Sequence, residues 1–158
     1  MNIYTGITNI PSTLLASGSP PELPGRLEDS DKGNLSLHGR RILIVEDESL
    51  IALLIEDALE EAGAEVVGPC YTLAECLKVA RSEWLDAAVL DVDIAGEDVF
   101  PAADQLRQRG IPIVFHTAHA DREELQTRFG EVAVCRKPIP MEDLLGVLSR
   151  AASATKSN

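Results

Sequence analysis

Five polar residues each close or follow a short apolar run, and their types suit chemistry at a single site. They are the acid pair Glu46 and Asp47, the single acid Asp91, the hydroxyl of Thr117 and the amine of Lys137. Helix capping or solvation explains any one of them alone. Capping does not predict that all five close apolar strands, so the joint pattern indicates a functional site.

The residue types in this set predict phosphoryl chemistry that depends on a metal ion. Three carboxylates repel one another unless a cation lies among them, and Lys137 alone cannot neutralise all three. Carboxylate oxygens are the ligands that Mg²⁺ prefers, so the acids predict a magnesium site. Asp91 beside this cation is a suitable nucleophile toward phosphorus, with Lys137 and Thr117 stabilising the transferring group. The predicted product is an aspartyl phosphate.

Short apolar runs alternate five times with amphipathic stretches, and this alternation has to position the five residues. The run from Ile42 to Val45 predicts a buried strand, and the apolar residues after it recur at helical spacing up to Gly63. The apolar stripe of this first helix comprises Ile51, Leu54, Ile55, Ala58, Leu59 and Ala62. Further strands are predicted at 65–68, 87–90, 111–115 and 132–135, with helices at 72–83, 99–106, 121–129 and after Pro140.

Strands that alternate with helices pair in parallel through right-handed crossovers. The predicted fold class is therefore α/β, a doubly wound five-stranded parallel sheet with helices on both faces, over residues 39–152. Residues 1–38 hold four Pro, four Gly and five Ser without any period, which predicts a flexible N-terminal extension, and 153–158 form a C-terminal tail. In such sheets a ligand binds beyond the carboxyl ends of the strands, where the polar residues stand.

The composition excludes several classes of function. The 158 residues include 26 acidic and 14 basic ones, a formal net charge of −12. This charge repels polyphosphate, so we expect no nucleic-acid partner. The apolar runs are far shorter than the about 18 residues that a membrane span needs, and no secretory signal is evident. Three cysteines without metal-type spacing indicate reduced thiols, so we expect a cytoplasmic protein.

The order and spacing of the polar residues resemble the receiver domains of two-component response regulators, over residues 40–150. The resemblance implies the flavodoxin-like strand order 2-1-3-4-5 and a bound Mg²⁺. It also implies one role for each site residue, with Asp91 as the phosphoacceptor. Glu46 and Asp47 are then the acid pair that holds Mg²⁺, and the backbone carbonyl of Asp93 is a further metal ligand. Thr117 is the switch hydroxyl, and Lys137, before a cis Pro138, contacts the phosphoryl group.

Two positions depart from the family pattern. Ala95 and Gly96 stand where many members have a proline after the phosphoacceptor, and Val134 stands where many have an aromatic residue before the lysine. The usual coupling of threonine movement to an aromatic rotamer is therefore not expected. Residues 90–115 resemble a subgroup of stand-alone receivers that partner HWE-type sensor histidine kinases.

The resemblance implies a single-domain response regulator, not an enzyme, that accepts a phosphoryl group from a sensor histidine kinase or a phosphotransfer protein. Only 21 residues follow Lys137, so we expect no C-terminal output domain and signalling through protein contacts. The face formed by the fourth helix, the fifth strand and the fifth helix is the expected docking surface for a downstream protein. A homodimer is left open.

Three other functions fit parts of the sequence. A receiver-like scaffold that takes no phosphate is the main alternative, because the switch aromatic is missing at Val134. A haloacid-dehalogenase-type phosphatase would use Asp91 and Asp93 as its Asp-x-Asp core, but those enzymes carry the motif on their first strand. A flavodoxin-like cofactor carrier is disfavoured, because Glu46 and its acidic neighbours would repel a flavin phosphate.

Overall fold

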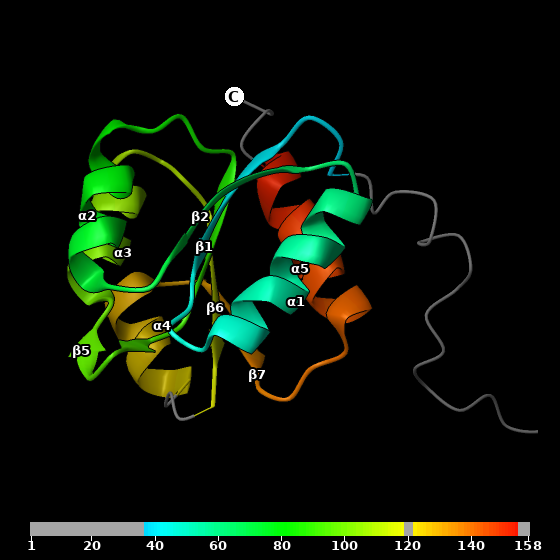
Figure 1. Ribbon diagram of the computed structural model, residues 1–158. Coiled ribbons are helices and arrows are strands. Elements are labelled where there is room, and N and C mark those ends of the chain that lie inside the picture. The colour runs from blue at the N-terminus through cyan, green and yellow to red at the C-terminus, as the bar shows by residue number, and fades with distance from the viewer. Residues whose placement is uncertain (1–36, 119–121, 155–158) are drawn as a thin grey trace, which may run out of the picture.

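A five-stranded sheet lies between two layers of helices (Figure 1). The computed structural model describes residues 37–118 and 122–154. The strands of the sheet are β1 (Arg41–Val45), β2 (Glu65–Cys70), β3 (Ala87–Leu90), β6 (Ile113–Thr117) and β7 (Ala133–Arg136). They lie in the order β2-β1-β3-β6-β7, and every neighbouring pair is parallel. Because β6 and β7 are the fourth and fifth strands of this sheet along the chain, the predicted order 2-1-3-4-5 is confirmed.

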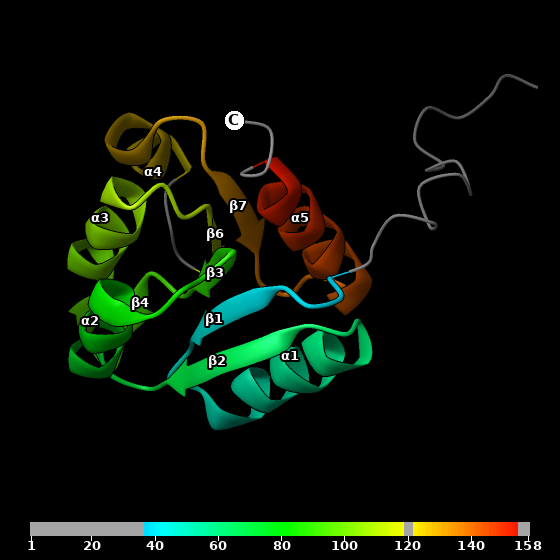
Figure 2. The same ribbon diagram turned by 90° about the horizontal axis from the view of Figure 1, so that it is seen from above.

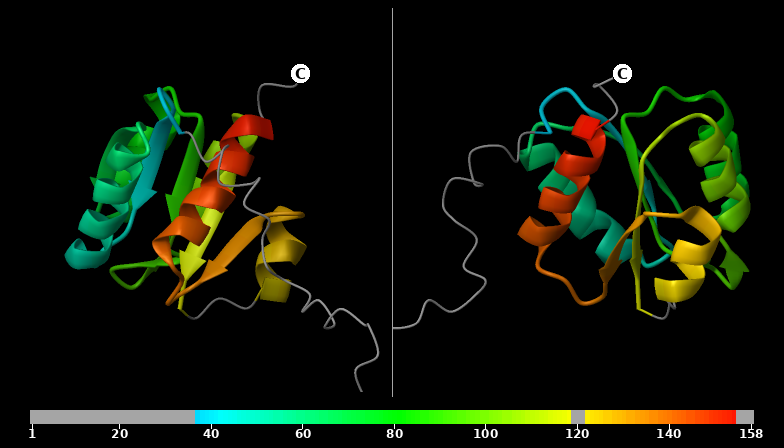
Figure 3. Two further views of the ribbon diagram at one scale, coloured as in Figure 1. Left: turned by 90° about the vertical axis from the view of Figure 1, so that its right-hand side faces the viewer. Right: turned by 180° about the vertical axis from the view of Figure 1, so that it is seen from behind.

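Helices cover both faces of the sheet, as predicted. Their bounds are α1 (Ser49–Glu61), α2 (Leu73–Ser82), α3 (Phe100–Gln108), α4 (Arg122–Phe129) and α5 (Met141–Ala154). Figures 1, 2 and 3 show α1 and α5 on one face and α2, α3 and α4 on the other. Within the described residues, no helix is long and apolar enough to cross a membrane. Most of the predicted N-terminal extension and C-terminal tail, residues 1–36 and 155–158, lies outside the described residues.

Alternation of side chains along the strands divides the core into two clusters, one on each face. In β1, Ile42 and Ile44 belong to the cluster that also contains Leu59 of α1. Leu43 and Val45 belong to the cluster on the opposite face, which includes residues of α2, α3 and α4. Central parallel strands buried on both faces read as continuous apolar runs. This burial pattern explains why the strands could be found from their sequence alone.

Helix α1 buries a narrower stripe than its sequence predicts. Ala52, Ile55 and Leu59 are buried, whereas Leu54, a member of the apolar stripe given by the sequence, is 52% exposed. At 100° per residue, Leu54 lies beside the stripe rather than on it. Leu50 and Leu53 are exposed as well, at 70% and 50%. The helix therefore presents an open apolar patch near its N-terminus.

Two features next to the strand ends differ from the prediction. The fourth strand of the sheet spans Ile113–Thr117 instead of 111–115, so Thr117 is its last residue. A second, two-stranded sheet follows β3, made of β4 (Asp93–Ile94) and β5 (Glu97–Asp98) in antiparallel pairing. Its turn is Ala95 and Gly96, with φ of 54° and 84°. Two-residue strands have no readable period, so the sequence did not predict this hairpin.

Helix α4 is held against the sheet by two apolar side chains. Leu125 is 1% exposed and Phe129 is 7% exposed. The Phe129 ring lies 5.3 Å from the ring of Phe115 in β6 and 5.5 Å from that of Phe100 in α3, measured between centroids. Aromatic pairs at this separation add packing energy beyond the area that they bury. This cluster ties α4 to the strand that ends in Thr117, although position 134 lacks an aromatic residue.

Candidate functional site

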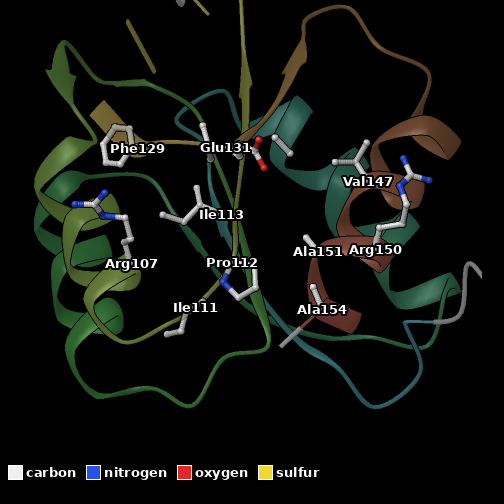
Figure 4. A pocket seen from close by; sticks show the side chains of 12 residues that line it. Arg107, Ile111, Pro112, Ile113, Phe129, Glu131, Val147, Arg150, Ala151 and Ala154 are labelled. Atoms are coloured by element: carbon white, nitrogen blue, oxygen red, sulfur yellow. The ribbon is translucent and has the colours of Figure 1, made fainter. Parts of the chain in front are cut away.

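A cleft of about 520 Å³ opens beyond the carboxyl ends of the strands. These strand ends lie at the lower edge of the sheet in Figure 1. The residues that line it are Asp47, Glu48, Asp91, Val92, Asp93, Asp98, Thr117, Ala118 and Lys137. Five of the residues proposed from the sequence are thus brought to one cleft, and the sixth, Glu46, contacts Lys137 beneath it. A second cavity of about 420 Å³ lies at the other end of the sheet and contains none of them (Figure 4).

Lys137 is the centre of the site. Its Nζ donates to Asp91 Oδ2 at 2.7 Å, lies 2.7 Å from Glu46 Oε2, and lies 3.7 Å from Glu48 Oε1. Its backbone N donates to the carbonyl of Thr117 at 3.0 Å, and the bond to Pro138 is cis, as the resemblance implies. Burial opposes the charge on Lys137 most strongly, but hydrogen bonds and charges from Asp91 and Glu46 together raise its pKa. Lys137 is therefore charged at neutral pH.

Glu46 directly follows β1 and is buried, with 1% of its surface exposed. Its Oε1 accepts a hydrogen bond from the backbone N of Glu48 at 3.2 Å. Its Oε2 forms an ion pair with Lys137 Nζ, which lies 2.7 Å away. Burial raises the pKa of Glu46, and Lys137 only partly reverses this effect. The ion pair with Lys137 therefore holds this buried carboxylate at the site.

Asp47 connects β1 to the hairpin that follows β3. Its Oδ2 accepts a hydrogen bond from the backbone N of Ala95 at 3.0 Å. In the same turn, Oδ1 of Asp93 accepts from the backbone N of Gly96 at 2.8 Å. Asp98 pairs with Asp93 across the hairpin and also lines the cleft. The bond from Ala95 ties the acidic hairpin to Asp47, and the bond from Gly96 closes the turn of the hairpin.

The acidic groups fit a divalent cation. One carboxylate oxygen from each of Glu46, Glu48 and Asp91 lies within 4.8 Å of the other two. Hard oxygen donors with a net negative charge are the set that Mg²⁺ or Ca²⁺ binds. Lys137 supplies only one positive charge to these three carboxylates, at 2.7 Å from Glu46, 2.7 Å from Asp91 and 3.7 Å from Glu48. The sequence prediction did not include Glu48 or Asp98, because spacing alone does not show which way an exposed acid turns.

The last two residues of β6 are polar and buried. Thr117 is 3% exposed and lines the cleft, as proposed for a switch hydroxyl. His116 is 5% exposed, and its Nδ1 has no hydrogen-bond partner within the described residues. Burial, assisted by the charge of Lys137, lowers the pKa of His116 to about 4. His116 is therefore neutral at physiological pH. His119, a second histidine after this strand, lies outside the described residues.

Comparison with known proteins defines the class of protein that this fold and site represent. Residues 42–149 match the family model of the response regulator receiver domain, and the chain belongs to this family. Among curated relatives, it is 33% identical over 117 residues to the transcriptional regulatory protein PdtaR of Mycobacterium tuberculosis, which covers 72% of this chain and 57% of PdtaR. The chain thus spans little more than half the length of that relative.

Solved structures give the same assignment. The response regulator PhyR of Brucella abortus is 30% identical, with a TM-score of 0.67, over 80% of this chain and 53% of PhyR. The receiver domain of the sensor histidine kinase PA1611 of Pseudomonas aeruginosa is 25% identical, with a TM-score of 0.64, over 73% of this chain and 98% of that domain. That receiver domain is described with a magnesium ion coordinated in its active site cleft.

Proposed function

We propose that this protein is a response regulator of a two-component phosphorelay, in which Asp91 accepts a phosphoryl group. The observation that carries the proposal is the contact of 2.7 Å between Lys137 Nζ and Asp91 Oδ2, in a cleft that Thr117 and an acidic cluster also line. Capping does not require a lysine on this carboxylate. A phosphoacceptor does, because charge develops on the transferring phosphoryl group.

Transfer of the phosphoryl group to Asp91 is a nucleophilic displacement at phosphorus. An Asp91 carboxylate oxygen forms a bond to phosphorus while the P–N bond of a phosphohistidine donor breaks, and the electron pair leaves with the histidine nitrogen. Lys137 offsets the negative charge of the phosphoryl oxygens, and the Thr117 hydroxyl donates to one of them. The donor is a sensor histidine kinase or a phosphotransfer protein, and the resemblance of residues 90–115 favours a kinase of the HWE type.

The residues that would hold Mg²⁺ are Glu46, Asp47, Asp91 and the backbone carbonyl of Asp93. The convergence of Asp47, Asp91 and Asp93 on one cleft, with Glu46 buried beside it, supports this assignment. When bound, the cation supplies positive charge that offsets the charge on the phosphoryl group. Lys137 and Thr117 then orient the phosphoryl group.

Output passes through protein contacts in this proposal, within the cytoplasm. The addition of about two negative charges at Asp91 favours the arrangement in which Thr117 and Lys137 close on the phosphoryl group. That arrangement alters the surface of α4, β7 and α5, where a downstream protein or a second copy docks. The cluster of Phe115 and Phe129 gives the strand a route to α4 without an aromatic at position 134.

Mass spectrometry of the intact protein tests the proposal. We expect incubation with acetyl phosphate to add a single phosphoryl group to the wild type in the presence of Mg²⁺ but not in EDTA. Asp91→Asn should fold and take no label, while Asp57→Asn, an exposed position on α1, should label like the wild type. Labelling of Asp91→Asn would overturn the proposal.

The same experiment separates the alternative functions. A folded wild type that takes no label from acetyl phosphate or from a phosphorylated kinase would indicate a receiver-like scaffold. Steady turnover of p-nitrophenyl phosphate, blocked in Asp93→Asn, would indicate a phosphatase. Family membership favours a signalling protein over both.

A further inference from the structure

The cavity of about 420 Å³ at the amino end of the sheet is not used by the proposed function. Figure 4 shows its apolar floor, made of Ile111, Pro112 and Ile113 at and just before the start of β6. Arg107 of α3 lies on one side of this floor, and Arg150 of α5 lies on the other. We call this cavity the amino-end groove. It combines an apolar floor with a basic side chain on each side.

The two arginines of the amino-end groove lack acidic partners. In the part of the chain that the structure describes, no carboxylate forms an ion pair with Arg107 or Arg150. By contrast, Arg128 pairs with Asp104 at 3.0 Å. Glu131 is the one acid among the described residues that line the groove, so the lining carries an excess of one positive charge. This charge, in a chain with a formal charge of −12, favours an acidic occupant.

The chain that precedes the described residues joins the domain close to the amino-end groove. Leu37 is fully buried and belongs to the same core cluster as Ala152 of α5. Ala151 and Ala154, in the same last turn of α5, line the groove. A helix is about 10–12 Å across. The five residues between Asp31 and Leu37 can pass around the end of α5, because an extended chain spans about 3.3 Å per residue.

The sequence has an acidic segment with apolar side chains at this distance. All four acidic residues among the first 36 lie within residues 22–31, which are outside the described residues. Leu23 and Leu27 lie between these acids, and Arg26 is the one base, so four acids and one base give the segment a formal charge of −3. The 21 residues before it have no charged side chain. Within the first 36 residues, this segment is therefore the one whose charge complements the groove.

We propose that residues 22–31 of this chain bind in the amino-end groove, with Leu23 and Leu27 on its apolar floor and the acidic side chains beside Arg107 and Arg150. The inference goes beyond the proposed function and does not rest on it. The groove includes residues of β7 and α5, so the bound segment covers part of the face assigned to the downstream protein. A partner at that face competes with a segment that is tethered to the same chain and therefore has a high effective concentration.

Disulfide trapping in the full chain tests this binding. Leu27→Cys places a thiol in the segment, Ala154→Cys places one at the groove, and the native cysteines are buried. The matched control is Leu27→Cys with Glu61→Cys. Glu61 is exposed at the end of α1, close to where the chain enters, because the backbone N of Gly39 donates to the carbonyl of Gly63 at 2.9 Å. Under copper-catalysed oxidation by dissolved oxygen, we expect the Ala154→Cys pair to form an intramolecular disulfide about tenfold faster than the control pair.

Charge reversal at the groove tests the role of the arginines. Arg107→Glu combined with Arg150→Glu should slow trapping at Ala154→Cys to the rate of the control pair, because both arginines are exposed and the fold does not depend on them. Lys78→Glu, exposed on α2, should leave the rate unchanged. Circular dichroism verifies that each variant is folded.

Three results would overturn the inference. The first is an equal rate of trapping at Ala154→Cys and Glu61→Cys, which would show proximity to the tether without binding. The second is a rate that does not respond to reversal of the two arginines. The third is a disulfide that forms between two chains, which would assign the groove to the segment of a second copy.

Discussion

The two ends of the sheet differ in how their charged side chains are paired. At the amino end, Arg40 donates to Asp86 at 3.0 Å, and Arg41 donates to Glu65 at 3.0 Å and to the carbonyl of Trp84 at 2.9 Å. Asp86 also accepts from the backbone N of Arg41 at 2.9 Å. At the carboxyl end, the acids that follow β1 and β3 line the cleft together with those of the hairpin, and Lys137 is the basic residue that lines it.

The charges at the amino end of the sheet stabilise the fold, whereas the charges at the carboxyl end serve the site. Arg40 and Arg41 are matched by nearby carboxylates, and these pairs join the starts of β1, β2 and β3. At the other end, Glu46 is buried with a raised pKa, and its cluster carries more negative charge than Lys137 can balance. Such an arrangement destabilises the fold and persists where it binds a ligand.

Removal of Lys137 should have the largest effect on stability. Lys137→Met leaves Glu46 and Asp91 in their partly or fully buried positions without a counter-charge. We expect a loss of about 3 kcal/mol in the free energy of unfolding, measured by urea denaturation in EDTA. Mg²⁺ should restore much of this loss, because it binds the same carboxylates. An unchanged midpoint in EDTA would show that the two ends do not differ as we infer.

The buried histidine at the carboxyl end should make stability depend on pH. His116 has a folded pKa of about 4, below its ordinary value of 6.5, so the unfolded state binds the proton first as the pH falls. Stability should therefore decrease from pH 6.5 toward pH 4, by up to about 3 kcal/mol. The raised pKa of Glu46 acts in the opposite direction, so the test is the difference between wild type and His116→Leu. Parallel stability curves for the two proteins would contradict this prediction.

The sequence was sufficient for the parts of the fold that rest on burial. The apolar runs of β1 and β3 predict central strands, and their order along the chain brings Asp91 and Lys137 to one edge. The pattern of buried residues does not determine which way an exposed side chain points. The turn of Asp47 toward Ala95, the approach of Glu48 to Asp91 and the hairpin itself depend on contacts between segments that no local pattern encodes.

The fourth strand and the first helix show the same limit. Pro112 lacks a backbone N–H, so its contribution to the pairing is only the carbonyl that accepts from Ala88, and the strand begins at Ile113. Leu54 fits the apolar spacing of α1 but lies beside the buried stripe. In both cases the composition of a segment was read correctly, and its alignment with the neighbouring element was not available from the sequence.

Removal of an ion pair at the amino end of the sheet should reduce stability moderately and leave the site intact. Asp86→Asn removes the charge from a carboxylate that accepts hydrogen bonds from Arg40 and from the backbone of Arg41. Because both groups are largely buried, we expect a loss of about 1–2 kcal/mol by urea denaturation. Labelling by acetyl phosphate should match that of the wild type. A loss of labelling in the folded variant would mean that the two ends are coupled.

The outermost ion pair should contribute least. Glu65 accepts from Arg41 at 3.0 Å, but its side chain is 63% exposed, so water screens the pair. Arg41 also keeps its bonds to Trp84 and to Glu83 when this partner is removed. We therefore expect Glu65→Gln to change the free energy of unfolding by less than about 0.5 kcal/mol. A loss as large as that of Asp86→Asn would show that the amino end depends on total charge rather than on buried hydrogen bonds. The two ends of the sheet would then differ only in how much net charge they carry, because the stability of both would depend on net charge in the same way.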